Sequence, residues 1–439
     1  MADVLLVQPP LPKTMADYVE EAVFCPPLGL GYIASNLLFH GFDTHVVDMA
    51  IVKMEEDAFK SEVSRHQPKL VGITANTLTY KNALKIAKAA KELNTEICTI
   101  LGGPHVTFTA EETLANPQVD IVVRREGEAT MLELASRLLK GDRRLHEVQG
   151  ISYKKDGKVV NNPDRPLIQN LDGLPYPARH LFSMRLYKIP GTLVTSRGCP
   201  YNCIFCSAGT LSGGRYRVRS HEDVVAEMRQ LINRFGVDYF FIADDTFTVF
   251  RDRTEKICRG IWELGVKVGW SCEARVNTVS RDVVQEMARS GCVCIQYGVE
   301  SGSQRILNHI RKGITVEQVK RAVRRSVEAG ISTFCNFMMP FPEDTLETLK
   351  ETEKLMKELK GMGAHLVLSM TTPFPGTYLR TYANELGISI LSEDTDRYDF
   401  VTPLFTTRHL SIDQIEQVFN DLSSLCDQTI ADIFPAKSA

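Results

Sequence analysis

Residues 195–207 of the chain read Thr-Ser-Arg-Gly-Cys-Pro-Tyr-Asn-Cys-Ile-Phe-Cys-Ser. This stretch holds three thiols, Cys199, Cys203 and Cys206, in the spacing C-x3-C-x2-C, directly after the strand-like residues 191–195. Thiolates packed this closely are typical ligands of an iron–sulfur cluster or a zinc ion. A structural zinc site or an electron-transfer cubane normally takes four protein ligands, and the neighbouring sequence offers no fourth Cys or His. We therefore expect one open metal position, which can bind and polarise a small ligand.

This spacing, with the aromatic Phe205 before the last cysteine, resembles the signature of the radical S-adenosylmethionine (SAM) enzymes. The resemblance implies that the three cysteines are the catalytic ligands of a 4Fe–4S cluster and that its open iron chelates SAM. It also implies that one electron cleaves SAM to a 5′-deoxyadenosyl radical, and that a donor such as a flavodoxin or ferredoxin supplies this electron. From the residues alone, buried core cysteines or a partial zinc knuckle are the alternatives.

Size and charge favour a protein that acts on small molecules. The 439 residues, 44% of them hydrophobic, supply cores for two or three domains. With 51 basic and 54 acidic residues, well mixed, the chain shows no basic stripe that would indicate a nucleic-acid partner. Eleven cysteines without a secretory leader indicate a reducing compartment, and the longest apolar runs are too short to span a membrane. We therefore expect a soluble, cytoplasmic protein.

Short apolar runs alternate with helical patterns over residues 1–145. The strand-like runs lie at residues 4–7, 44–48, 70–75, 97–101 and 120–123. This order predicts a doubly wound, flavodoxin-like α/β domain with a parallel sheet, which binds ligands beyond the carboxyl ends of its strands. The loop residues at those ends, which we expect to bind a cofactor, are Thr74, Asn76, Thr77, Gly102, Gly103, Glu126 and Gly127. An ordinary flavodoxin-like domain with glycines at its turns is the alternative.

The joint occurrence of this domain and the cysteine stretch is more specific. Residues 26–32 (Pro-Pro-Leu-Gly-Leu-Gly-Tyr), 102–105 (Gly-Gly-Pro-His) and 126–128 (Glu-Gly-Glu), placed before the cysteines, resemble the cobalamin-dependent class of radical SAM enzymes. The resemblance implies that the first domain binds cobalamin. The D-x-H-x-x-G motif of methionine-synthase-type domains is absent, so we interpret His45 as a strand side chain and His105 as a lining or capping residue.

Residues 146–190 are predicted to form a connector with a β-hairpin, and residues 191–380 a partial (β/α)6 barrel. Each further strand pattern of the barrel ends in a polar cluster, as the active-site face of such barrels requires. SAM carries a sulfonium, an ammonium, a carboxylate and a ribose diol, so its pocket needs acceptors and a cation. The residues that the resemblance assigns to SAM are Asp245, Glu273, Arg275, Glu300 and Ser301. Helix capping is the alternative for such acids, including Asp244 and the pair Glu343-Asp344.

Several other residues carry weaker expectations. Phe341 stands where the family usually has a glycine before a proline, so its ring is expected to shape the adenine or substrate pocket. Cys292 and Cys294 are predicted to share one face of a strand, and Cys335 is the best candidate for an additional functional thiol among cysteines that mostly fill cores. Residues 381–439 are predicted to be mostly helical, with periodicity over Ile412–Phe434.

The leading hypothesis is a cobalamin-dependent methyltransferase. Ordinary alkylation by SAM needs a nucleophile, whereas the radical chemistry of the resembled class reaches an unactivated carbon or a phosphinate phosphorus. A ring-forming oxidation, as in the anaerobic porphyrin cyclase that the chain also resembles, is the alternative within that class. A non-catalytic iron–sulfur or cobalamin redox sensor is the alternative from another class. The sequence does not indicate which small molecule is the substrate.

Overall fold

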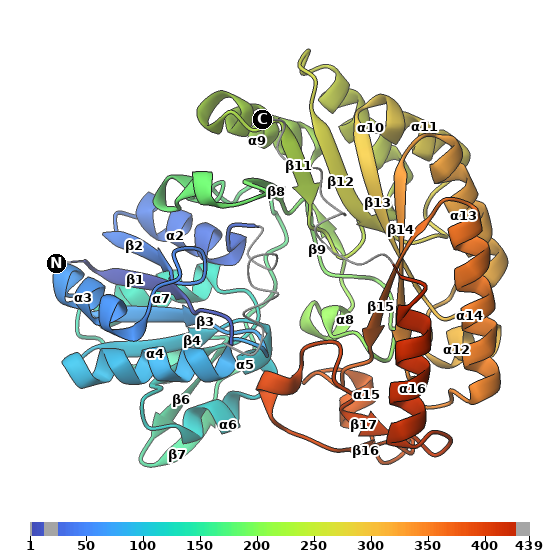
Figure 1. Cartoon of the computed structure of the whole chain (residues 1–439). Coiled ribbons are helices and arrows are strands. Elements are labelled where there is room, and N and C mark those ends of the chain that lie inside the picture. The colour runs from blue at the N-terminus through green and yellow to red at the C-terminus, as the bar shows by residue number, and fades with distance from the viewer. Residues whose placement is uncertain (1, 13–24, 427–439) are drawn as a thin grey trace. The chain divides into compact units, whose positions relative to one another are not determined.

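The computed structural model describes residues 2–12 and 25–426 of the chain. The chain forms two compact units, Met1–Pro190 and Gly191–Ala439, and each is built around a largely parallel sheet (Figure 1). Within the described ranges, no helix combines the length and the apolar character that a membrane crossing requires.

The first unit contains a seven-stranded sheet in the order β2-β1-β3-β4-β5-β6-β7. Its parallel strands are β1 (Val4–Gln8), β2 (Thr44–Asp48), β3 (Leu70–Thr74), β4 (Cys98–Gly102) and β5 (Ile121–Val123). Its helices are α2 (Leu28–Phe39), α3 (Glu56–His66), α4 (Tyr80–Leu93), α5 (Pro104–Phe108), α6 (Ala110–Ala115) and α7 (Glu128–Leu138), with the 3-10 helices η2 (Leu145–Glu147), η3 (Arg179–Leu181) and η4 (Met184–Leu186). The strands are apolar on both faces because helices cover both faces. The predicted doubly wound fold is confirmed.

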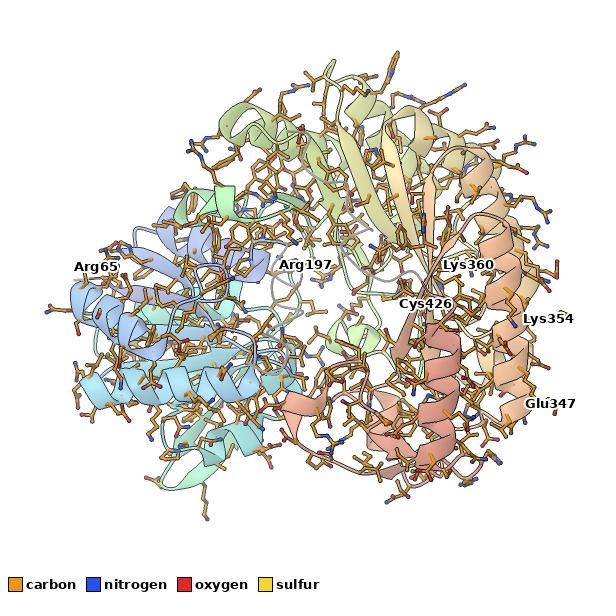
Figure 2. The ribbon with its side chains drawn as sticks, in the orientation of Figure 1. Arg65, Arg197, Glu347, Lys354, Lys360 and Cys426 are labelled. Atoms are coloured by element: carbon orange, nitrogen blue, oxygen red, sulfur yellow. The ribbon has the colours of Figure 1, made fainter. Side chains whose placement is uncertain are left out.

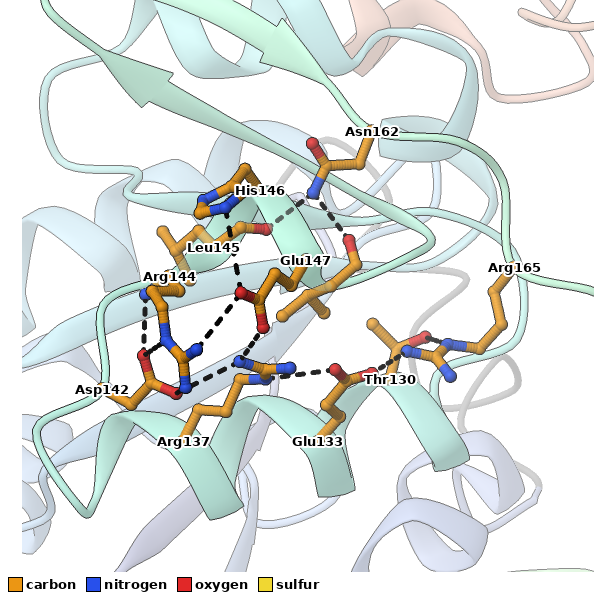
Figure 3. Close-up of polar contacts among 11 residues, drawn as sticks. Thr130, Glu133, Arg137, Asp142, Arg144, Leu145, His146, Glu147, Asn162 and Arg165 are labelled. Carbon is orange, nitrogen blue, oxygen red and sulfur yellow. Dashed lines mark hydrogen bonds and ion pairs between the residues drawn. The ribbon is translucent and has the colours of Figure 1, made fainter.

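The hairpin predicted within the connector adds two antiparallel strands to this sheet. β6 (Ile151–Lys155) pairs with β5, and β7 (Lys158–Asn161) pairs with β6. Just after the hairpin, Asn162 donates to the carbonyls of Leu145 and Val148, both at 2.6 Å. Arg165 donates to the Thr130 hydroxyl of α7 at 2.9 Å and pairs with Glu133 (Figure 3). These residues are therefore part of the packing of the first unit.

A buried tyrosine attaches the last residues of this unit to the sheet. Tyr187 is fully buried, and its hydroxyl donates to the carboxylate of Asp48 at 2.7 Å. Asp48 ends β2 and also accepts from the backbone N–H groups of Ala50 and Ile51. Burial raises the pKa of Asp48 despite these three donors. The segment before Pro190 is thus held at the carboxyl end of β2 by a partner more than a hundred residues away in sequence.

The described part of the second unit has a six-stranded parallel sheet in the order β15-β14-β13-β12-β11-β8. The strands are β8 (Gly191–Leu193), β11 (Tyr239–Ile242), β12 (Gly269–Ala274), β13 (Cys292–Glu300), β14 (Ser332–Met339) and β15 (His365–Met370). The helices are α8 (Ala208–Leu211), α9 (His221–Phe235), α10 (Arg251–Trp262), α11 (Arg281–Arg289), α12 (Gln304–His309), α13 (Val316–Glu328), α14 (Leu346–Gly361) and α15 (Tyr378–Thr381), with the 3-10 helix η5 (Phe247–Val249) and the short strands β9 (Ser196–Arg197) and β10 (Arg217–Val218). The strand order follows the chain and leaves β8 and β15 as edges, so the predicted partial barrel is confirmed.

Side chains alternate along these strands between the helix-covered core and the inner face of the sheet. Cys335 belongs to the helix-covered core with Tyr297, so it does not face the inside of the barrel, where an additional functional thiol would act. Cys292 joins the same core, whereas Cys294 packs with Phe334 in a separate cluster. The register between β12 and β13 shifts at this point, and the extra residue reverses the alternation. The prediction that Cys292 and Cys294 share a face is therefore wrong.

The chain ends with α16 (Ile412–Ser423), preceded by a two-stranded sheet of β16 (Ser389–Ile390) and β17 (Phe405–Thr406) and the 3-10 helix η6 (Thr395–Arg397). Lys360 at the end of α14 donates to the carbonyl of Leu425 at 2.6 Å, next to Cys426 (Figure 2). The predicted helical region thus contains a helix, and also a small sheet that the sequence did not indicate. Residues 427–434 of the predicted helix lie outside the described residues.

Candidate active site

The loop that carries the three thiols begins where β8 ends and is held by Asp244, which lies just after the neighbouring strand β11. Thr195 and Ser196 donate their backbone N–H groups to Asp244 at 2.6 and 3.0 Å, and their hydroxyls at 2.5 and 2.7 Å. Asp244 is 1% exposed. The helix-capping alternative for Asp244 is wrong, because the N-cap positions nearby belong to Thr246 and Phe250.

The cysteine loop is also held in its middle. Ile204 is buried, donates to the carbonyl of Ile310 at 3.1 Å, and accepts from the N–H of Leu379 at 2.8 Å. The N–H of Cys206 donates to the carbonyl of Cys203 at 3.2 Å, which closes a tight turn between two of the thiols. The loop backbone is therefore ordered by protein contacts on both sides, which leaves the sulfur atoms available for ligation.

Burial opposes ionisation of two of the thiols, Cys199 and Cys206. Burial raises the pKa of Cys206 to about 11 and raises the pKa of Cys199, and the Asp245 carboxyl adds to both increases. A bound cation or cluster reverses this preference, because it deprotonates coordinating thiols. In the described ranges, no three His, Cys, Asp or Glu side chains converge on one ion position. Three thiols that do not converge on one ion position fit a cluster, because each thiol then ligates a different iron atom.

Carboxyl groups gather at the ends of the strands beside this loop. Glu273 lies on the inner face at the end of β12 with its side chain exposed, and partial loss of hydration together with Asp245, Asp244 and Glu300 raises its pKa to about 7. Burial and Asp244 also raise the pKa of Asp245, to which Gly198 donates a backbone N–H. An approaching cation such as the ammonium or sulfonium of SAM would favour the ionised form of both.

Two of the residues assigned to SAM have partners inside the fold. Glu300 forms an ion pair with Lys312 at 2.5 Å, and each side chain is 7% exposed. The hydroxyl of Ser301 lies 3.2 Å from that of Thr352 on α14 and accepts from the N–H of Ser303 at 3.1 Å. These contacts organise the turn after β13, and a SAM contact of either side chain stays a prediction.

Phe205 of the cysteine loop packs against a second aromatic ring, that of Phe341. The ring centroid of Phe205 lies 5.5 Å from that of Phe341, and the ammonium of Lys312 lies 5.7 Å from the Phe205 ring. Phe341 is fully buried and its N–H donates to Asp344 at 2.7 Å. The expectation that its ring shapes the adenine or substrate pocket is therefore wrong, because the ring fills the core beneath the cysteine loop. Asp344 precedes the N-cap Thr345 of α14 and binds Thr348 at 2.8 Å.

Sequence reasoning missed the segment that closes the loop from the other side. Three consecutive carbonyls of this segment accept hydrogen bonds. That of Ile310 accepts from Ile204, that of Arg311 from the Cys203 thiol, and that of Lys312 from Arg275. The only local signal was the glycine after Lys312, which has a φ of +66° and permits this turn.

The candidate cobalamin edge of the first unit is formed by three loops. Ala75 donates to the carbonyl of Gly102 at 2.7 Å, His105 donates its backbone N–H to Ala75 at 3.2 Å, and Arg125 donates to the Thr107 hydroxyl at 2.9 Å. Gly103 has a φ of +108°, and a Cβ there would lie 2.6 Å from the carbonyl oxygen of Ala75. The loops after β3, β4 and β5 thus form one edge with small side chains, which fits close approach by a large cofactor.

The predicted cobalamin residues divide into two groups. Thr74, Gly102 and Gly103 lie on this edge, where Thr74 is paired with Gly102. The others have partners within the unit: Asn76 accepts from Thr79 at 2.9 Å, Thr77 lies 3.1 Å from His105 Nδ1, Glu126 accepts from Ile168 at 2.7 Å, and Gly127 faces Ile33. Their contacts with cobalamin stay predictions.

The two histidines occupy different positions in the first unit. His45 is in β2, as predicted, with Nε2 3.1 Å from the carboxylate of Asp43. The ring of His105 is buried against that of Tyr80, with centroids 4.2 Å apart.

Comparison with known proteins identifies the family. Residues 193–356 match the Radical SAM superfamily, and residues 19–135 match the B12 binding domain. Over 420 residues the chain is 37% identical to the uncharacterized methyltransferase PH0819 of Pyrococcus horikoshii, covering 94% of this chain and 90% of that protein. The chain is a cobalamin-dependent radical SAM enzyme. The cofactors of this family are a 4Fe–4S cluster, SAM and cobalamin.

Two further proteins are similar to this radical SAM enzyme. It is 32% identical over 393 residues to the anaerobic magnesium-protoporphyrin IX monomethyl ester cyclase of Rubrivivax gelatinosus, covering 86% of this chain and 69% of that protein. Its fold matches the radical SAM methyltransferase TsrM of Kitasatospora setae, solved with cobalamin and a 4Fe–4S cluster, with a TM-score of 0.78 at 18% identity over 100% of this chain and 93% of that chain. Methyltransferases and cyclases thus both occur among its relatives.

Proposed function

We propose that this radical SAM enzyme is a methyltransferase that methylates an unactivated carbon or phosphorus atom of a small molecule. The observation that carries the proposal is the 37% identity to PH0819, which is named a methyltransferase and is matched along 90% of its length. The cyclase of Rubrivivax gelatinosus is less similar, at 32% identity over a shorter span.

The residues have distinct roles in this proposal. Cys199, Cys203 and Cys206 hold the cluster on the ordered loop. Asp245 and Glu273 would face the positive groups of SAM, and a bound positive charge would favour the ionised form of Glu273, with its proton released to solvent. The edge formed by the loops after β3, β4 and β5 holds cobalamin. When bound, the cluster supplies the electron that cleaves SAM, cobalamin supplies the methyl group, and a flavodoxin or ferredoxin supplies electrons to the cluster.

The products of SAM distinguish the candidate functions. Purified enzyme is loaded anaerobically with iron, sulfide and hydroxocobalamin, then given SAM and a reductant. We expect both 5′-deoxyadenosine and S-adenosylhomocysteine, because methyl transfer consumes SAM in two ways. 5′-Deoxyadenosine without S-adenosylhomocysteine would support the ring-forming oxidation, which the similarity to the cyclase favours as second candidate. Neither product would support a redox sensor.

A cysteine variant tests the cluster assignment in the same assay. We expect Cys203→Ala to reduce 5′-deoxyadenosine formation at least a hundredfold, about 3 kcal/mol of barrier, because a cubane with two protein ligands is lost or inactive. Cobalamin absorption should be unchanged, because Cys203 lies outside the first unit. Cys335→Ala is the control, since that buried thiol packs in the helix-covered core and should leave SAM cleavage intact. Normal cleavage by Cys203→Ala would contradict the assignment.

A further inference from the structure

The guanidinium of Arg275 lies against the cysteine loop. Its Nη1 is 3.8 Å from the Sγ of Cys203, and its Nη2 donates to the carbonyl of Lys312. The residue is 5% exposed. The guanidinium is thus directed toward the sulfur side of the site.

An aromatic ring and an amide fix this orientation. The Cζ of Arg275 lies 3.7 Å from the centroid of the Tyr201 ring, and Tyr201 lies in the loop between Cys199 and Cys203. The Nε also donates to the side-chain oxygen of Asn277 at 3.4 Å. A guanidinium stacked on a ring and bonded at its edge has little freedom to move toward another partner.

This contact has an electrostatic consequence once Cys203 ligates iron. Arginine stays charged at all relevant pH values, so a thiolate at position 203 accepts a charge-assisted hydrogen bond from a permanent cation. Reduction adds one negative charge to a cluster, and a nearby cation stabilises the reduced form more than the oxidised form. Hydrogen bonds to the sulfurs are among the factors that set the potential of such clusters.

We propose that Arg275 is a positioning residue that orients Cys203 and raises the reduction potential of the cluster. The role differs from the SAM contact that the family resemblance implies for this arginine. It rests on the cluster ligation by Cys203 that the proposed function includes.

The test is a redox titration of the full-length protein, loaded with iron and sulfide and kept free of SAM. The signal of the reduced cluster in electron paramagnetic resonance is measured against potential for the wild type, Arg275→Gln and Arg275→Lys. At the wild-type midpoint, we expect the ratio of reduced to oxidised cluster in Arg275→Gln to fall about tenfold, which is 59 mV for one electron. Arg275→Lys keeps the positive charge but not the fixed geometry, so its ratio of reduced to oxidised cluster should fall less.

The control is Arg311→Gln, which removes a neighbouring positive charge. The Arg311 guanidinium lies 4.4 Å from the ring centroid of Tyr378, and its side chain is exposed. We expect its midpoint to equal that of the wild type. An equal shift in Arg311→Gln would show a general charge effect and overturn the proposal.

The remaining outcomes are also decisive. An unchanged midpoint in Arg275→Gln with normal iron content would overturn the proposal, and weakened SAM binding in that variant would then show that Arg275 contacts SAM. If Arg275→Gln does not take up iron, Tyr201→Leu replaces it, because this change removes the ring that holds the guanidinium. A lower midpoint in Tyr201→Leu supports the proposal and an unchanged one overturns it. Failure of the wild type to take up iron would instead refute the cluster ligation itself.

Discussion

Glu273 is a carboxyl group of the site whose pKa is raised toward neutral pH. Burial and the carboxyls of Asp245, Asp244 and Glu300 raise its pKa to about 7 from an ordinary value of 4.5. Below pH 4.5 the group is protonated in both the folded and the unfolded chain, so it does not affect stability. Between pH 4.5 and 7 the carboxyl group is ionised in the unfolded chain but stays largely protonated in the folded chain. The free energy of unfolding therefore falls as pH rises through this range.

The variant Glu273→Gln tests this pH dependence. In protein free of cluster and SAM, we expect the variant to gain thermal stability relative to the wild type as pH rises from 5 to 8, because the amide cannot ionise. Unfolding followed by circular dichroism at both pH values measures the difference. Glu347→Gln, on the exposed first turn of α14, should show no such trend (Figure 2). A stability difference that is the same at both pH values would contradict the raised pKa.

At the scale of elements, the cysteine loop depends on the strand beside it. Ile242 of β11 pairs with Leu193 of β8, so the residues just beyond the two strand ends meet at one edge. Asp244 therefore lies next to Thr195 and Ser196, where it accepts two backbone and two hydroxyl hydrogen bonds. These hydrogen bonds attach the beginning of the cysteine loop to the end of the neighbouring strand.

Asp244→Ala should damage both stability and cluster uptake. The change leaves two buried N–H groups without an acceptor, and each costs about 1–3 kcal/mol. We expect the free energy of unfolding to fall by roughly 2–4 kcal/mol, measured by urea denaturation, and less iron to bind per chain. Asp245→Ala is the matched control, since this side chain is more exposed than Asp244 and accepts a single backbone N–H, from Gly198, so its removal should cost only about 1 kcal/mol. Equal effects of the two variants would show that the contacts of Asp244 are not specific.

At the scale of the whole molecule, each unit contains its own sheet and core. The first unit extends to Pro190 because the β6–β7 hairpin completes its sheet and Tyr187 binds Asp48. A unit with its own core can fold by itself.

Truncated chains test where the first unit ends. We expect residues 1–190 to unfold cooperatively and to retain hydroxocobalamin through gel filtration, detected by its absorption. Residues 1–145 should be less stable, because they leave β5 as an open edge and Asp48 buried without Tyr187. Equal stability and cobalamin retention of the two fragments would show that residues 146–190 contribute nothing to the unit.

Local patterns were sufficient to predict much of this architecture. The three cysteines and the adjacent aromatic residue all lie within eight positions of the sequence. Apolar runs of four to eight residues indicate buried strands. The apolar runs correctly predicted the doubly wound first domain and the partial barrel, and the resemblance of the motifs to a known family correctly predicted the family and its cofactors. These features follow from short-range chemistry, which a sequence displays directly.

Contacts between distant residues could not be predicted in this way. Asp244 with Thr195, Phe341 with Phe205, and Arg275 with Cys203 are separated by tens of residues or more. The shift in register at β13 also reversed the faces of two cysteines. The sequence by itself determined which chemistry the chain can carry, because ligand type and spacing are local. Only the tertiary structure decided which side chains face the site and which fill the core, because strand register and the ends of adjacent strands bring those groups together.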